Sequence, residues 1–206
     1  MKNMPRLVLV GAIVVAGCAG IASRNDVSEE QVAAMLKASF KENGQAKLDR
    51  LDQDGLQKTC SEYAQKPMPK EVAQRIEAEQ LQLVKFPADG KLMGDWKGGE
   101  RIAQTGVGLQ YSDDPKAPAG GNCYACHQLT KAEVSFGTIG PSLYNFGKLR
   151  GYTPEMQKYA YSKLYNADAF AACSNMPRFG HKGILTEQQL KDVVALLMDP
   201  ASPVNH

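Results

Sequence analysis

The residues best placed to do chemistry lie together near the middle of the chain, in the run Cys-Tyr-Ala-Cys-His at positions 123–127. Two thiols three positions apart can form thioether bonds to the two vinyl groups of one haem, and the histidine that follows then lies beneath the iron. This chemistry requires both the spacing and the order of the residues. The motif therefore predicts one covalent c-type haem, held by Cys123 and Cys126 and ligated by His127.

Two other kinds of site also use closely spaced cysteines. A thioredoxin-like dithiol requires a preceding strand in a βαβ context, whereas the flanks of this motif are a Gly-rich loop and a helical pattern. A zinc site requires a second pair of ligands. The remaining candidates beyond the N-terminus, Cys60, Cys173, His181 and His206, include no pair at ligand spacing. Haem is therefore the cofactor that the sequence favours.

The second axial ligand of such a haem separates electron transfer from ligand binding or redox catalysis. Most of the eight methionines lie on predicted helix faces or at the N-terminus. Met176 instead lies in a loop with Pro177 and Gly180, which can hold a rigid turn and aim the thioether at the iron. We expect Met176 to be the second metal ligand, with His181 as the alternative.

The N-terminus has the pattern of an export signal. Lys2 and Arg6 precede the apolar run 7–16, which is too short to span a membrane as a mature helix. Val-Ala-Gly before Cys18 resembles a bacterial lipobox, in which the cysteine is lipidated and becomes the mature N-terminus. Ordinary removal of a signal peptide, residues 1–22, is the alternative. Either route predicts a periplasmic protein, and lipidation of Cys18 would add a membrane anchor.

Export also changes how the remaining cysteines are interpreted, because an oxidising compartment permits disulfides. Of the five cysteines, Cys18 belongs to the leader, and Cys123 and Cys126 belong to the haem motif. Only Cys60 and Cys173 are left. We therefore expect a disulfide between Cys60 and Cys173, which would connect the N-terminal part of the chain to the predicted methionine loop.

Composition and charge exclude several classes of protein. The 206 residues are 43% hydrophobic and 22% charged, which indicates a globular protein rather than a disordered, collagen-like or multi-span membrane chain. There are 24 Lys and Arg against 22 Asp and Glu, and loss of the leader with Lys2 and Arg6 leaves 22 of each. A net charge near zero predicts no nucleic-acid partner.

The spacing of apolar residues predicts an all-α chain of two units. In the first unit, residues 25–86, we expect three helices. The first is capped by Ser28, the second covers residues 48–63, and the third begins at Pro69. This unit is therefore expected to be an α-helical extension of the part of the chain that holds the motif.

The second unit, residues 94–200, is expected to position the chemistry. Asp95 can cap a short helix that ends near Gln104, and Thr153 followed by Pro154 can begin another. The clearest helix begins at the Thr-x-x-Gln capping box of residue 186. A polar, Gly-containing stretch separates the two units, and no strand or internal repeat is predicted.

Four landmarks of the second unit resemble a class I cytochrome c. They are Gly-Asp-Trp-Lys-Gly-Gly-Glu at 94–100, the Cys-x-x-Cys-His motif, Gly-Pro-Ser-Leu at 140–143, and Met-Pro at 176–177. More narrowly, the segments GTIGPSLYNFGKLRGYTPEM and CSNMPRFGHKGILTEQQLKDVVALL resemble SoxX, the family of monohaem subunits of SoxAX sulfur-oxidation cytochromes. The first unit has no place in a minimal class I cytochrome c and resembles the N-terminal extension of longer SoxX forms.

The class I resemblance implies a set of haem-binding residues. Cys123 and Cys126 would carry the haem, and His127 and Met176 would be its axial ligands. The backbone carbonyl of Pro141 would accept a hydrogen bond from the free ring nitrogen of the histidine and fix its orientation.

The SoxX resemblance implies partners and a place in a reaction. The chain would form a periplasmic heterodimer with a SoxA-like cytochrome subunit, in which thiosulfate is oxidatively joined to a cysteine of the SoxYZ carrier, an L-cysteine S-thiosulfotransferase activity. The bond-making chemistry would lie on the partner. This chain would pass the electrons to a downstream electron acceptor.

Two other classes of function share part of this pattern. A free-standing periplasmic electron carrier to a terminal oxidase would have the same haem residues, and a haem enzyme or gas sensor would need an exchangeable sixth ligand. The sequence offers no acid–base cluster that could make bonds at sulfur. We therefore expect an electron-transfer subunit, with no catalytic residues of its own.

Overall fold

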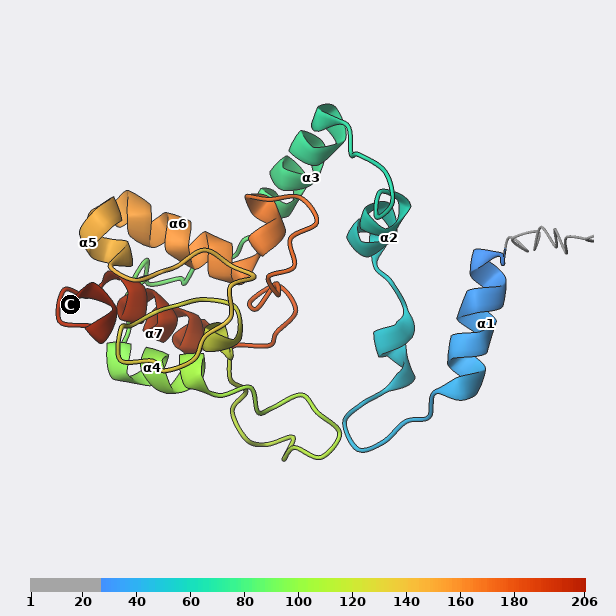
Figure 1. The fold of residues 1–206 in the computed structure, drawn as a ribbon, viewed down its shortest axis with the longest axis horizontal. Coiled ribbons are helices and arrows are strands. Elements are labelled where there is room, and N and C mark those ends of the chain that lie inside the picture. The colour runs from blue at the N-terminus through green and yellow to red at the C-terminus, as the bar shows by residue number, and fades with distance from the viewer. Residues whose placement is uncertain (1–26) are drawn as a thin grey trace, which may run out of the picture.

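The computed structural model describes residues 27–206, and the regular elements of this part are helical throughout (Figure 1). The α-helices are α1 (Glu29–Ser39), α2 (Gly55–Glu62), α3 (Lys70–Gln82), α4 (Trp96–Gln104), α5 (Phe146–Arg150), α6 (Pro154–Tyr165) and α7 (Glu187–Met198). Short 3-10 turns are η1 (Leu48–Leu51), η2 (Cys123–Ala125), η3 (Ala167–Ala169) and η4 (Pro203–Asn205). The predicted all-α class is confirmed; the export signal and Cys18 lie outside the described residues.

Capping side chains fix where several helices begin. Asp95 accepts hydrogen bonds from the first amides of α4, and Thr153 accepts one from Met156 at the start of α6, as predicted. Ser28 and Thr186 each form the predicted capping box, at α1 and α7. These ends follow from residues three positions apart, so the sequence alone could place them.

The core of the molecule lies around α7, within the C-terminal unit (residues 94–206). Val194 and Leu196 on α7 are fully buried, and α4 and α6 pack against this helix. The approach of α4 is close, because Gly99 faces the backbone of Asp192 and a Cβ there would overlap its carbonyl oxygen. Burying each large apolar side chain of this core contributes about 1.5–3 kcal/mol. This packing makes the C-terminal unit the rigid frame of the site.

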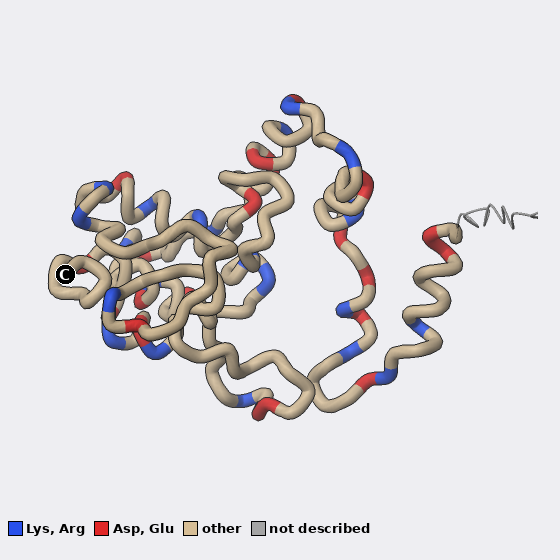
Figure 2. Tube along the Cα trace, viewed as in Figure 1, with Lys and Arg blue, Asp and Glu red and all other residues tan. Residues whose placement is uncertain are grey.

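Residues 27–86, which we call the extension, run around one side of the C-terminal unit (Figure 1). Basic and acidic side chains are interspersed along this stretch (Figure 2). The helix α1 buries none of its residues, whereas α3 buries Ile76 and Gln80. Within residues 27–206, no helix is both long and apolar enough to cross a bilayer.

The structure corrects two expectations about local elements. The single helix predicted over residues 48–63 is wrong: η1 and α2 are separate, because Asp54 adopts extended backbone angles and caps α2 through the amide of Gln57. The helix α5 was not predicted, because it has only five residues and follows Asn145, which has a left-handed backbone conformation.

Candidate haem site

The Cys-x-x-Cys-His motif folds as one tight turn at η2. The amides of Cys126 and His127 both donate to the carbonyl of Cys123, at 3.1 and 2.9 Å. Just before it, the amides of Gly121 and Asn122 donate to the carbonyls at the end of α4. The turn therefore brings two thiols and one imidazole together and fastens them to a core helix.

Both thiols of the motif are free of a disulfide. Burial raises the pKa of the Cys123 thiol to about 12, so that the thiol stays protonated at neutral pH. A redox dithiol and a zinc site both depend on an accessible thiolate. Among residues 27–206 there is also no cluster of three or more His, Cys, Asp or Glu side chains that could hold a metal ion. These observations favour thioether formation over both alternatives.

The ring of His127 is held on two sides. Its Nδ1 lies 2.7 Å from the backbone carbonyl oxygen of Pro141, which is the contact implied by the class I resemblance. Because a carbonyl can only accept, Nδ1 carries the proton, and Nε2 keeps a free lone pair for a metal ion. Gly140 lies against the ring, and a Cβ at this position would overlap Cε1. The imidazole is thus oriented before any ligand binds.

Met176 lies in the loop between η3 and α7, residues 170–186, which we call the methionine loop. Its side chain is partly buried against the core. Its amide donates to the Ser174 hydroxyl at 3.2 Å, and the Ser174 amide donates to Asp168 at 2.9 Å. Phe179, further along the loop, is buried. Met176 also lines a cavity of about 460 Å³ between this loop and α2. The loop is therefore held on both sides of Met176.

His181, the alternative ligand, lies in the same loop. Its amide donates to the carbonyl of Tyr165 at 2.9 Å. Burial, together with the nearby cations Arg178 and Lys182, lowers the pKa of its ring. A neutral imidazole is able to bind iron, so His181 remains the alternative to Met176.

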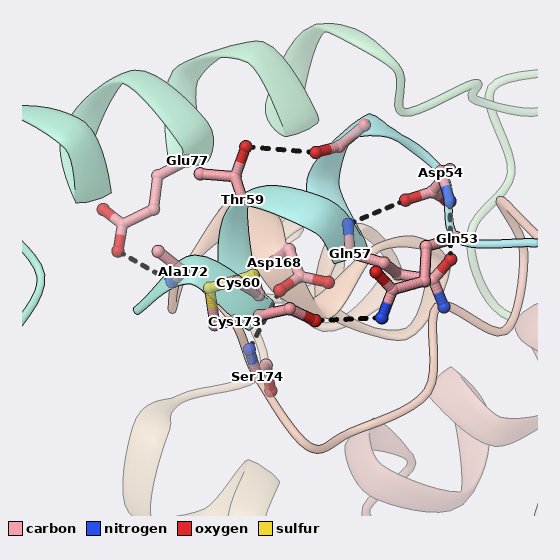
Figure 3. The surroundings of a disulfide bond; sticks show 12 residues. Gln53, Asp54, Gln57, Thr59, Cys60, Glu77, Asp168, Ala172, Cys173 and Ser174 are labelled. Carbon is pink, nitrogen blue, oxygen red and sulfur yellow. Dashed lines mark hydrogen bonds between the residues drawn. A yellow bond between two sulfur atoms is a disulfide. The ribbon is translucent and has the colours of Figure 1, made fainter. Parts of the chain in front are cut away.

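A disulfide between Cys60 and Cys173 joins α2 to the start of the methionine loop, which is the pairing expected from the sequence (Figure 3). The two Cα atoms are 5.6 Å apart and 113 positions apart in the chain. Nearby, Glu77 of α3 accepts a hydrogen bond from the Ala172 amide at 3.2 Å. The extension is therefore attached, covalently and by a hydrogen bond, immediately before the loop that carries Met176.

A second attachment, which was not predicted from the sequence, lies on the other side of Met176. The guanidinium of Arg178 donates to Asp54, at the start of α2, at 2.7 Å, and Lys182 makes an ion pair with the same oxygen. The Asp-x-x-Gln spacing at residue 54 indicates a helix cap. Nothing in it indicates a partner 124 positions away.

The residues of this region fit a covalently bound haem. Two uncommitted thiols stand at the required spacing, and an imidazole beside them offers a free ring nitrogen.

Comparisons with known proteins agree with this geometry. The family model described as cytochrome c matches residues 99–199, a span that contains the motif and the methionine loop. A protein of Aquifex aeolicus (strain VF5), named "Uncharacterized lipoprotein", is 40% identical over 155 residues, which cover 74% of this chain and 73% of that protein. The cofactor predicted from the motif, covalent haem c, is confirmed by the family match.

Proposed function

Residues 99–199 match the cytochrome c family, whose members transfer electrons through covalently attached haem c, and from this premise we propose that the protein is an exported monohaem electron carrier with histidine and methionine ligation. One observation carries this proposal. The hydrogen bond from His127 Nδ1 to the Pro141 carbonyl orients the ring and leaves Nε2 free to bind a metal ion. The same turn presents Cys123 and Cys126.

The roles of the residues follow from their chemistry. The haem, when bound, supplies a one-electron couple between ferric and ferrous iron. Cys123 and Cys126 would hold it by thioether bonds, and His127 would ligate from one side. The thioether of Met176 would ligate from the other side, and as a soft donor it favours the reduced metal and raises the reduction potential. Two fixed protein ligands suit electron transfer, because they leave no position for a substrate.

The ligand assignment can be tested on the holoprotein. Met176→Ala should abolish the charge-transfer band between methionine and ferric iron and lower the reduction potential. His181→Ala, in the same loop, is the matched control and should leave both unchanged. If Met176→Ala leaves the optical spectrum and the reduction potential unchanged while His181→Ala changes both, His181 is the ligand instead.

We propose further that the chain acts as the electron-accepting subunit of a SoxAX-type complex. The support is the SoxX-like sequence around Met176. A SoxA-like cytochrome should copurify with the tagged protein, and thiosulfate with SoxYZ should reduce its haem only when that subunit is present. A monomer reduced without a SoxA-like subunit would instead indicate a free-standing carrier.

The place of action that we propose is the periplasm, at a membrane surface. Cys18 follows a lipobox-like Val-Ala-Gly, and the Aquifex relative is named a lipoprotein. Mass spectrometry of the mature N-terminus should find a lipid on Cys18, and the protein should sediment with membranes. An unmodified N-terminus near residue 23 would show ordinary cleavage.

A further inference from the structure

A small cluster of charges joins the extension to the methionine loop. Asp54 lies at the N-terminus of α2, and its Oδ2 accepts a hydrogen bond from Arg178 Nη2 at 2.7 Å. Lys182 Nζ lies 2.7 Å from the same oxygen. The cluster thus connects a residue of the extension with two residues that follow Met176 closely in the chain.

Arg178 is the central member of the cluster because it is buried. It is only 8% exposed, and it lies two positions after Met176. A buried guanidinium is strongly unfavourable without a paired carboxylate. Asp168 is the second carboxylate near it, but that oxygen is 3.8 Å from Nε, whereas Asp54 lies at hydrogen-bond distance. Asp54 is therefore the main partner that keeps Arg178 in place.

The methionine loop has an attachment on each side of Met176. The disulfide at Cys173 fixes the chain three positions before it, and the pair of Arg178 with Asp54 fixes the chain two positions after it. Both attachments lead to α2, and Leu56 of this helix lines the same cavity as Met176. The position of the thioether is thus set from the extension as well as from the C-terminal unit.

We propose that Asp54 is a positioning residue for the distal ligand: by holding Arg178 it keeps the methionine loop against α2 and Met176 at the iron. This inference rests on the ligation by Met176 proposed above. The C-terminal unit offers Arg178 only the more distant carboxylate of Asp168, at 3.8 Å, so the extension supplies the closer partner. The extension therefore acts on the haem through the loop.

The test is the substitution Asp54→Asn in the holoprotein. Asparagine caps a helix as well as aspartate does, so α2 keeps its cap while the negative charge is lost. Imidazole, added to the oxidised protein, binds only when Met176 leaves the iron. We expect the apparent affinity for imidazole to rise about tenfold and the reduction potential to fall, because the loop opens more often.

Asp52→Asn is the matched control. Asp52 is an exposed residue of the same segment, paired with Lys37 at 3.0 Å and not with the loop, and its loss changes the net charge equally. We expect it to leave the imidazole affinity and the potential unchanged. Asp54→Glu, which keeps the charge with a longer side chain, should lie between the native protein and Asp54→Asn, and it serves as the test variant if Asp54→Asn does not fold.

Two results would overturn the proposal. One is an imidazole affinity and a potential that stay native in Asp54→Asn. The other is an equal change in Asp52→Asn, which would show an effect of net charge alone. Failure of the ligand assignment itself is recognised separately, because Met176→Ala would then leave the optical spectrum of the haem unchanged.

Discussion

The helices α1 and α3 belong to the same extension, but they differ in what they contact. Both have an apolar stripe in the sequence. In α1 the stripe stays exposed, with Val32 at 44% and Met35 at 64%, whereas α3 buries Ile76 at 4%. Gln80 of α3 also accepts hydrogen bonds from the buried amide of Asn166, at 3.0 and 3.2 Å. Apolar residues at helical spacing therefore predict a helix, but they do not predict whether its apolar face packs against the rest of the protein.

The attachment of the extension begins after α1. Gln45 donates to the carbonyl of Gln110 at 2.8 Å, and Arg50 of η1 donates to that of Leu109 at 2.7 Å, so the chain around η1 already contacts the C-terminal unit. The helices α2 and α3 follow with the disulfide, the Asp54 cluster and Ile76. Stability and ligand geometry should thus depend on residues 45–86 and little on α1.

The largest effect should come from breaking the covalent link. We expect Cys60→Ser to lower the free energy of unfolding by about 4–5 kcal/mol, because a disulfide that closes a loop of more than a hundred residues restricts the unfolded chain strongly. It should also weaken the charge-transfer band by loosening the methionine loop. Thermal unfolding with and without reductant measures the first effect, and reductant should leave the melting temperature of Cys60→Ser unchanged.

A smaller effect should come from matched truncations in the two helices. Ile76→Ala removes a buried side chain and leaves a cavity, which should cost about 2–4 kcal/mol of unfolding free energy. Met35→Ala in α1 removes an exposed side chain and should change the unfolding free energy by less than about 0.5 kcal/mol. Urea unfolding of the two variants compares the regions directly. Equal costs would mean that α1 packs as α3 does.

The smallest effect should depend on pH. Burial by itself would raise the pKa of Asp54, but hydrogen bonds from Lys182, the Gln57 amide and Arg178 hold that pKa well below its usual range. The stability that the charge contributes is therefore fully present above about pH 4 and is lost as the pH falls through the folded-state pKa. Asp54→Asn should be less stable by about 1 kcal/mol near neutral pH.

The difference in unfolding free energy between the native protein and Asp54→Asn should then become smaller below about pH 4. Urea unfolding at several pH values measures this difference. A difference that stays constant down to about pH 2 would assign the effect to shape and not to charge. The same titration of Asp52→Asn supplies the baseline, because that carboxylate is exposed.

Local chemistry was predictable from the sequence. The haem motif and the caps at Ser28, Asp95 and Thr186 all depend on residues within four positions of one another, and the structure shows each of these turns. The export expected from the sequence left Cys60 and Cys173 to pair, so even this distant link could be expected. Once the haem motif and the leader cysteine were set aside, only one pair of cysteines remained.

Other features could not be predicted because they depend on tertiary contacts. The pair of Asp54 with Arg178 joins positions 124 apart, and either residue alone is typical of a solvated surface. The break between η1 and α2 depends on Asp54 forming a cap where the apolar spacing continues. The exposed face of α1 is likewise a property of the whole fold. These are also the features by which the extension acts on the methionine loop.

The order of the cysteines sets a condition on how the protein is made. The link from Cys60 to Cys173 encloses Cys123 and Cys126, and these four thiols could pair in three ways. In the export proposed above, the N-terminus crosses the membrane first, so Cys60 and both motif thiols would reach the oxidising side before Cys173. Pairing in order of arrival would consume the thiols that the cofactor needs. Under that proposal, maturation requires the motif to be kept reduced, or already joined to its haem, until Cys173 arrives.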